Sequence, residues 1–173
     1  NSLSNIEKRG EFPQLSEVQA QKIVCLHNLK NYQLSLSLSD QFLKQFPKHK
    51  LKDNTLFIRA ENLLQLKRNN EALQAFNVFL KDNNEHNKTD LAKLRKAQLH
   101  HIAKDWDNAL TAAEPLLSLS KFNNQFSQVP FILGDSYFMK KNWNNAISFL
   151  KIFISEFQKN KTVSDTELIK NTP

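Results

Sequence analysis

Residues 132–154 read ILGDSYFMKKNWNNAISFLKIFI, and this stretch decides the fold. Apolar residues recur three and four positions apart on both sides of the polar run Lys140-Lys141-Asn142, which puts them on one face of each of two helices. Ala146 follows the polar run, and two antiparallel helices approach closely only where a side chain is short. The stretch therefore predicts an antiparallel helix pair joined by a short turn.

The same pattern returns along the chain with a spacing of 37 residues and no insertion. A small residue marks each copy: Ser35, Ala72, Ala109 and Ala146. A lysine stands five positions before each of them: Lys30, Lys67, Lys104 and Lys141. An apolar pair follows on each second helix: Phe42-Leu43, Phe79-Leu80, Leu116-Leu117 and Phe153-Ile154. A fixed period of about 20–50 residues is typical of helical-repeat proteins.

The period predicts an all-α protein, a right-handed α-solenoid of four antiparallel helix pairs. Neither helix of a pair can bury its apolar face alone, so we expect the core to form where neighbouring pairs stack. The predicted parts are a lead-in over 1–14, repeats over about 15–51, 52–88, 89–125 and 126–159, and a polar tail or truncated element over 160–173. The turns lack glycine, so Asn31 and Asn142 are expected to take the left-handed conformation there.

Composition agrees with a thin, nearly all-helical architecture. Only 40% of the 173 residues are hydrophobic, and the chain holds two glycines and five prolines. Helix breakers are therefore few. No apolar run of about 18 residues exists, so no membrane-spanning segment is expected, and no export-signal pattern is present at the N-terminus. The chain begins with Asn1 rather than Met, and we expect it to be a segment of a longer protein.

The residue types needed for catalysis or metal binding do not gather in this sequence. His100 and His101 are adjacent and point in different directions on a helix, and no histidine pair has the i, i+4 spacing of a metal site. Cys25 falls among apolar residues, where it is expected to act as a small core residue. No phosphate-binding loop or nucleophile motif is present. The sequence thus predicts no catalytic residue, no metal, no cofactor and no enzymatic activity.

The last repeat resembles a tetratricopeptide repeat. The residues that carry the resemblance are Leu133-Gly134, Tyr137, Trp143 and Ala146, and the fit extends over about residues 15–158. The period of 37 differs from the usual repeat of about 34 residues. This longer period is similar to the repeats of bacterial envelope proteins, the outer-membrane assembly lipoprotein and the Tol-Pal-associated coordinator among them. The basic residues Lys22, Arg59 and Lys96, which stand where the fourth repeat has Leu133, depart from the family pattern.

The resemblance implies that the first helix of each pair lines a concave binding groove. Three rows of groove residues follow from it: Phe57, Leu94 and Phe131; Leu64, His101 and Phe138; Glu61, Gln98 and Asp135. The apolar members Phe57, Leu94, Phe131 and Phe138 are the expected anchors for a partner. The alternative is that these side chains are core, since large apolar residues on helices are usually buried. Exposure decides between the two interpretations.

The expected function is that of a protein-interaction scaffold or adaptor that holds a partner peptide or helix. A homo-oligomer is possible but is not indicated by the sequence. The resemblance implies a periplasmic or envelope location, with the cytoplasm as the alternative. A clamp for chaperone C-termini is disfavoured, because its positions hold Ala20, Val24, Ile58 and Leu91, and only Arg95 fits.

Two other functions stay open. The net charge of +7 and the cluster Lys44, Lys48, Lys50 and Lys52 allow binding of nucleic acid or anionic lipid. Against this, the basic residues are spread along the chain and no aromatic-interleaved basic stripe accompanies them. The chain could also be a structural spacer between other domains, in which case the groove would hold no ligand.

Overall fold

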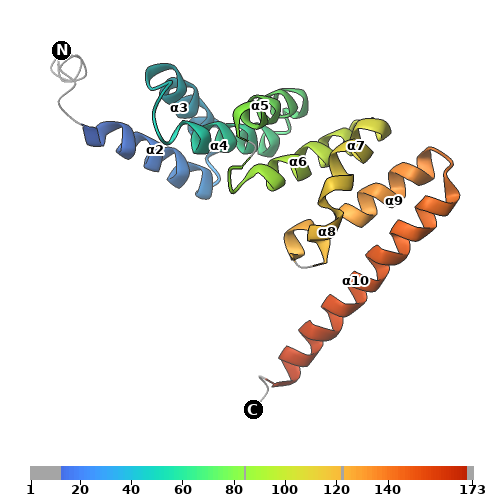
Figure 1. Cartoon of the computed structure of the whole chain (residues 1–173). Helices are drawn as coiled ribbons and strands as arrows, with labels where there is room; N and C mark the ends of the chain where they lie inside the picture. The colour runs from blue at the N-terminus through green and yellow to red at the C-terminus, as the bar shows by residue number, and fades with distance from the viewer. Residues whose placement is uncertain (1–12, 84, 122, 171–173) are drawn as a thin grey trace. The chain divides into compact units, whose positions relative to one another are not determined.

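The computed structural model describes residues 13–83, 85–121 and 123–170, and every regular element among them is helical (Figure 1). The chain divides into two compact units, Asn1–His86 and Asn87–Pro173, close to the boundary expected between the second and third repeats. Most of the predicted lead-in, residues 1–12, lies outside the described residues. The described part confirms the predicted all-α class of helix-pair repeats.

The first unit contains two helix pairs. Its helices are α2 (Pro13–Asn28), α3 (Tyr32–Gln45), α4 (Lys52–Gln65) and α5 (Asn69–Asp82). Each helix packs on the next one in the chain (Figure 1). One core cluster joins Ala20, Ile23, Phe42 and Ile58, which come from α2, α3 and α4. The first pair is therefore held to the second by the apolar contacts that the period predicted.

The second unit contains the third and fourth pairs, with an irregular second helix in the third. Its elements are α6 (Thr89–Ile102), α7 (Trp106–Ala113), the 3-10 helix η1 (Glu114–Leu116), α8 (Leu117–Ser120), the 3-10 helix η2 (Asn124–Phe126), α9 (Val129–Met139) and α10 (Trp143–Lys170). Pro115 lies in η1, and because proline has no backbone N–H, the α-helical ladder breaks there. The long helix α10 continues past residue 159, where the fourth repeat was expected to end.

The turns between paired helices are built from main-chain hydrogen bonds. In the first turn the N–H of Lys30 donates to His27 O and the N–H of Asn31 donates to Leu26 O, each at 2.9 Å, which is the Schellman arrangement. The same two bonds recur in the other three turns. The left-handed residue is the lysine of each repeat, with φ of 60°, 59°, 59° and 60° at Lys30, Lys67, Lys104 and Lys141.

The expectation that Asn31 and Asn142 take the left-handed conformation was therefore wrong. Asn31 has φ of −85° and caps α3, where its side chain accepts a hydrogen bond from the N–H of Leu34. Asn142 does the same for α10, with its side chain accepting from the N–H of Asn145. Each asparagine thus begins the second helix, and the residue before it ends the first helix.

The four small residues of the period are buried between their helices, as predicted: Ser35, Ala72, Ala109 and Ala146. Ser35 alone carries a hydroxyl, and it is part of a buried polar chain. Its Oγ donates to Ile23 O at 2.9 Å and accepts from Asn62 Nδ2 at 2.8 Å. His27 Nδ1 lies 2.8 Å from Asn62 Oδ1. These bonds tie α2, α3 and α4 together, and they satisfy an amide that is fully buried.

Candidate functional site

Two of the four expected groove anchors are core residues. Phe57 is only 4% exposed, and its ring contacts Phe76 and Phe79 of α5 with centroid distances of 6.0 and 5.5 Å. Leu94 is buried in the main core cluster of the second unit. The alternative interpretation, that these side chains are core, therefore holds for Phe57 and Leu94. Glu61 is buried as well, and Leu64 is half-buried, so the first unit presents little of the expected groove.

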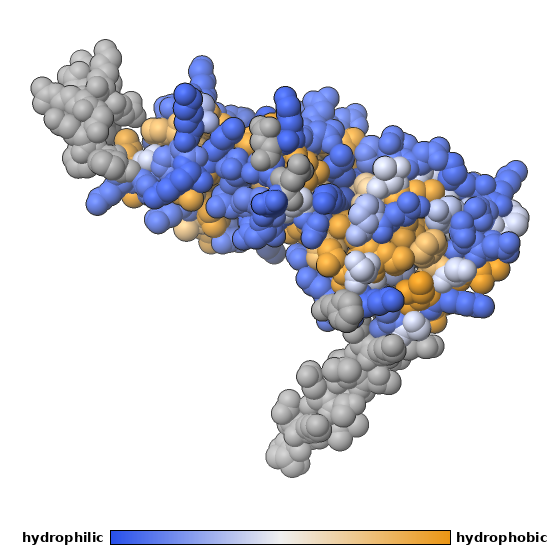
Figure 2. All heavy atoms as spheres, in the orientation of Figure 1, coloured by the Kyte–Doolittle hydropathy of each residue, from blue (hydrophilic) through white to orange (hydrophobic). Residues whose placement is uncertain are grey.

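The second unit presents the other two anchors at its surface. Phe131 and Phe138 lie on α9 and are 40% and 50% exposed. Asp135 lies between them in sequence, and the spacing i, i+4, i+7 puts all three on one side of the helix. Figure 2 shows apolar residues gathered on the face of this unit that is turned to the viewer. These two phenylalanines are thus available for contact with another molecule.

Two polar side chains of α6 contact α9 and the residue just before it. His101 Nε2 lies 2.8 Å from Asp135 Oδ2, and the rings of His101 and Phe131 are 5.9 Å apart. Gln98 Nε2 donates to Gln128 Oε1 at 3.0 Å. We call the surface formed by these groups the α6–α9 face: Gln98, His101, Phe131, Asp135 and Phe138. All five were expected from the sequence, and the structure brings them together on two neighbouring first helices.

Two tryptophans belong beside this face, and sequence reasoning did not assign them to it. The ring of Trp106 is 5.5 Å from that of His101, and the ring of Trp143 is 5.4 Å from that of Phe138. The two contacts are separated by one period, so the signal was present in the spacing of these four residues. The two tryptophans add apolar surface next to His101 and Phe138.

The arrangement is suited to holding a ligand rather than transforming one. The aromatic rings supply apolar contact area, and Asp135, whose side chain is about one third exposed, accepts hydrogen bonds. Among the residues that the structure describes, no group of three His, Cys, Asp or Glu side chains is placed to hold a metal ion.

Cys25, expected in the core, is exposed, because its position on α2 points away from the cluster formed by Ala20 and Ile23.

The lysine cluster considered for nucleic acid or lipid extends from the end of α3, through the loop that follows, to the first residue of α4. Lys50 Nζ is 3.1 Å from Glu17 Oε1 of α2. The hydrogen bond from Lys50, helped by one from Ser16, lowers the pKa of Glu17 from 4.5 to about 2. One of the four ammonium groups is therefore engaged within the protein. None of the helices that the structure describes combines the length and apolar character needed to cross a bilayer.

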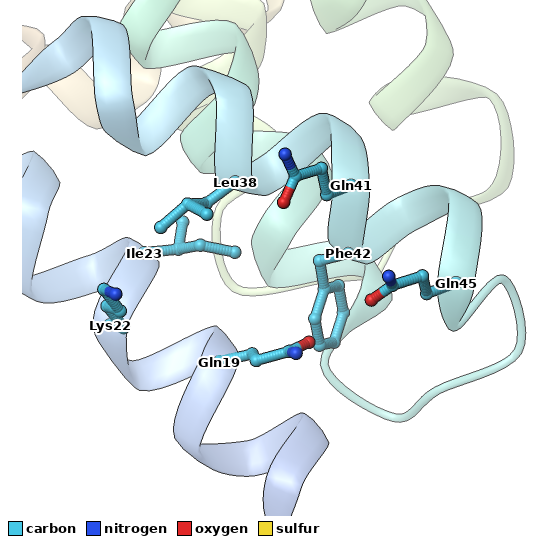
Figure 3. Close-up of a pocket in the computed structure, with 7 residues that line it drawn as sticks. All are labelled: Gln19, Lys22, Ile23, Leu38, Gln41, Phe42 and Gln45. Carbon is cyan, nitrogen blue, oxygen red and sulfur yellow. The ribbon is translucent and has the colours of Figure 1, made fainter. Parts of the chain in front are cut away.

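A small recess lies in the first unit between α2 and α3 (Figure 3). Its volume is about 180 Å³, below the roughly 300–1,000 Å³ of ordinary small-molecule sites. Figure 3 shows Ile23, Leu38 and Phe42 at the recess, with glutamine amides and Lys22 around it. Its full lining is Gln19, Lys22, Ile23, Leu38, Gln41, Phe42 and Gln45. The recess is too small to serve as a cofactor site.

Comparison with known proteins agrees with this geometry. Two crystal structures of a putative kinesin light chain from Podosopora anserina, with nearly identical TPR-like repeats, are similar in fold, each at 14% identity and a TM-score of 0.64. The matches cover 89% and 88% of this chain and 80% and 79% of the other. At this identity the likeness shows the fold alone, that of tetratricopeptide-like helical hairpins. None of the curated proteins compared matches in sequence.

The family match is more extensive. The family model YfiO, described as outer membrane lipoprotein, matches residues 2–170. It spans both compact units and all four helix pairs. The chain, a tetratricopeptide-like repeat protein, therefore belongs to the YfiO outer membrane lipoprotein family.

Proposed function

We propose that this chain is a protein-interaction scaffold whose α6–α9 face holds a peptide or helix of a partner protein. The observation that carries the proposal is the exposure of Phe131 and Phe138 on a helix whose other large side chains are mostly buried. Exposed aromatic residues grouped with a few polar groups are a mark of interaction sites. Aromatic side chains of this kind also tend to dominate binding energy when a partner covers them.

The chemistry of the face indicates what the partner offers. A large apolar side chain of the partner would lie against Phe131 and Phe138, and a donor group, either a basic side chain or a main-chain N–H, would meet Asp135. His101 holds the Asp135 carboxylate in place through their 2.8 Å contact, which limits the ordering cost of binding. Gln98 adds an amide at the edge of the face.

Family membership supports a place in the bacterial envelope. The description outer membrane lipoprotein favours a role as a subunit of a multiprotein assembly at that membrane, on its periplasmic side. In this role the α6–α9 face would recruit a neighbouring subunit or a client protein. The fold supports binding rather than catalysis, since repeat proteins of this kind present extended surfaces and no enclosed pocket.

The test is affinity capture from an envelope extract with quantitative mass spectrometry. The full chain is compared with the double variant Phe131→Asp, Phe138→Asp and with Val78→Asp, which changes an equally apolar, exposed position on α5. We expect a partner that is retained by the parent and by Val78→Asp and lost by the double variant, with helicity by circular dichroism equal in all three. Retention by all three proteins, or capture of nucleic acid alone, would contradict the proposal.

A further inference from the structure

An apolar stripe runs along the first half of α10 and faces solvent. Its members Trp143, Ile147 and Ile154 are each about half exposed. Lys151, also exposed, lies on the same side of the helix, four residues after Ile147 and three before Ile154. We call this surface, formed by Trp143, Ile147, Lys151 and Ile154, the α10 stripe.

The repeat shows what covers such a stripe. One period before Ile147, which is 53% exposed, stands Leu110 of α7, which is 7% exposed and belongs to a core shared with α9. In the first unit the same position is Leu36 of α3, which is buried, and α3 packs on α4. In each unit the covering element is the first helix of the following pair. The α10 stripe has the geometry of that interface, with no helix of the described chain in the covering position.

Charge distinguishes the α10 stripe from the two internal interfaces. The counterparts of Lys151 are Asp40, Asn77 and Glu114, and the two acidic ones each contact the following first helix. Asp40 Oδ1 accepts a hydrogen bond from Arg59 Nε of α4 at 2.6 Å, and Glu114 Oε1 accepts one from Tyr137 Oη of α9 at 2.9 Å. In the fourth pair this position has the opposite sign. A helix that covers the α10 stripe therefore needs an acceptor, such as a carboxylate, where the internal helices carry a donor.

Residues 157–170 do not supply the covering helix, because they continue α10 itself. The second helices α3 and α5 end at Gln45 and Asp82, and after α3 the chain turns back into α4. The equivalent point in α10 is Glu156, but α10 continues as a helix through residues 157–170. Each further residue of helix adds about 1.5 Å, so residues 157–170 extend beyond the stripe instead of folding over it.

We propose that the α10 stripe binds an amphipathic α-helix of another protein in the way α9 packs on α7. The partner helix presents aliphatic and small side chains at i, i+3, i+4 and i+7, as α9 does with Val129, Ile132, Leu133 and Ser136. It also places a Glu or Asp next to Lys151. Trp143 contacts Phe138 of the α6–α9 face, but Ile147, Lys151 and Ile154 do not belong to that face, so this inference does not rest on the function proposed above.

The experiment uses two synthetic helical peptides and the full chain. Both peptides carry the Val-Ile-Leu-Ser stripe of α9; one has glutamate at the flanking positions and the other has lysine. The chain contains two tryptophans, so Trp106→Phe leaves Trp143 as the only reporter for fluorescence titration. We expect the glutamate peptide to bind up to about fivefold more tightly than the lysine peptide, as for a charge pair at the rim of an interface.

Substitutions distinguish binding at the α10 stripe from nonspecific apolar binding. Lys151→Glu should invert the preference between the two peptides, and Ile147→Asp should weaken binding of both by at least about tenfold. Val78→Asp should leave both affinities unchanged. An unchanged preference in Lys151→Glu, or no binding of either peptide, would overturn the proposal. Sedimentation velocity is run in parallel, because self-association abolished by Ile147→Asp would make a second copy of the chain the occupant and overturn it too.

Discussion

A Cβ atom placed on Gly134 of α9 would lie 2.7 Å from Cγ of Leu150 on α10. The two helices of the fourth pair therefore meet where one residue has no side chain. In the third pair the same two positions hold Ala97 and Ala113, both fully buried. Where the fourth pair has glycine instead of alanine on its first helix, it has leucine instead of alanine on its second helix. The two helices therefore pack closely in both pairs.

Gly134→Ala should destabilise the second unit despite the better helix propensity of alanine. The gain from propensity is about 1 kcal/mol, whereas forcing a methyl group against Leu150 costs about 1–3 kcal/mol because the contact is at the branch point of the side chain. We expect a net loss of up to about 2 kcal/mol in the free energy of unfolding, measured with urea. Leu150→Ala in the same chain recreates the Ala97–Ala113 arrangement. The double variant should therefore lose less than the sum of the single losses, and strict additivity would argue against the clash.

Ser35→Ala should destabilise the first unit although three of the four repeats have alanine at this position. The substitution removes the acceptor of the buried Asn62 amide, and an unsatisfied buried donor costs about 1–3 kcal/mol. Asn62→Leu, which copies Leu99 one period later, removes the amide itself. In a double-mutant cycle by thermal unfolding, we expect the cost of Ser35→Ala to fall markedly in the Asn62→Leu background. Equal costs in both backgrounds would show that the hydroxyl does not depend on Asn62.

Lys104→Gly should stabilise the second unit. Lys104 has φ of 59°, and a left-handed conformation costs an L-residue about 1–2 kcal/mol. Glycine avoids this cost, but part of the gain is offset because glycine raises the conformational entropy of the unfolded chain. We expect a gain of about 0.5–1 kcal/mol in the free energy of unfolding. The control is Ala103→Gly, one residue earlier at φ of −75°, which should lose stability. A loss in both variants would mean that the lysine side chain itself stabilises the turn.

Acid should loosen the contact between α2 and the loop before α4. The pKa of Glu17 is lowered to about 2 by the hydrogen bond from Lys50, so the folded state favours the carboxylate. The resulting stabilisation is present above pH 4.5 and is lost as the pH falls toward 2. In an NMR titration of the Glu17 carboxyl group, Lys50→Gln should raise its pKa toward 4.5. Lys48→Gln should leave it unchanged; an equal rise in both variants would assign the shift to general charge.

The period predicted the fold because the decisive requirement, a short side chain where two helices meet, is visible in residue type. It predicted the left-handed turn residue less well. Residue preference favours Asn31, whereas the hydrogen bonds that end α2 require the left-handed residue one position earlier, at Lys30. The position in the main-chain hydrogen-bond pattern overrides the conformational preference of the residue type. Residue types alone do not reveal that position.

Exposure of the expected groove could not be read from the period either. Phe57 and Phe131 are the same residue type at the same repeat position, yet one is core and the other is partly exposed. Each contacts the aromatic residue of its own second helix, Phe79 or Phe153. Phe57 in addition packs on Phe76, where the fourth repeat has Leu150. Burial depends on the summed volume of neighbours, which differs between repeats whose spacing is identical.

The turns that end the first helices have a consequence for how this protein can change over evolutionary time. Their hydrogen bonds join main-chain N–H and C=O groups, so the hairpin geometry makes no demand on the side chain of Lys30, Lys67, Lys104 or Lys141 beyond tolerance of the left-handed conformation. Substitutions at these four exposed sites can alter the charge and binding preferences of the surface while every helix pair keeps the angle at which its members meet.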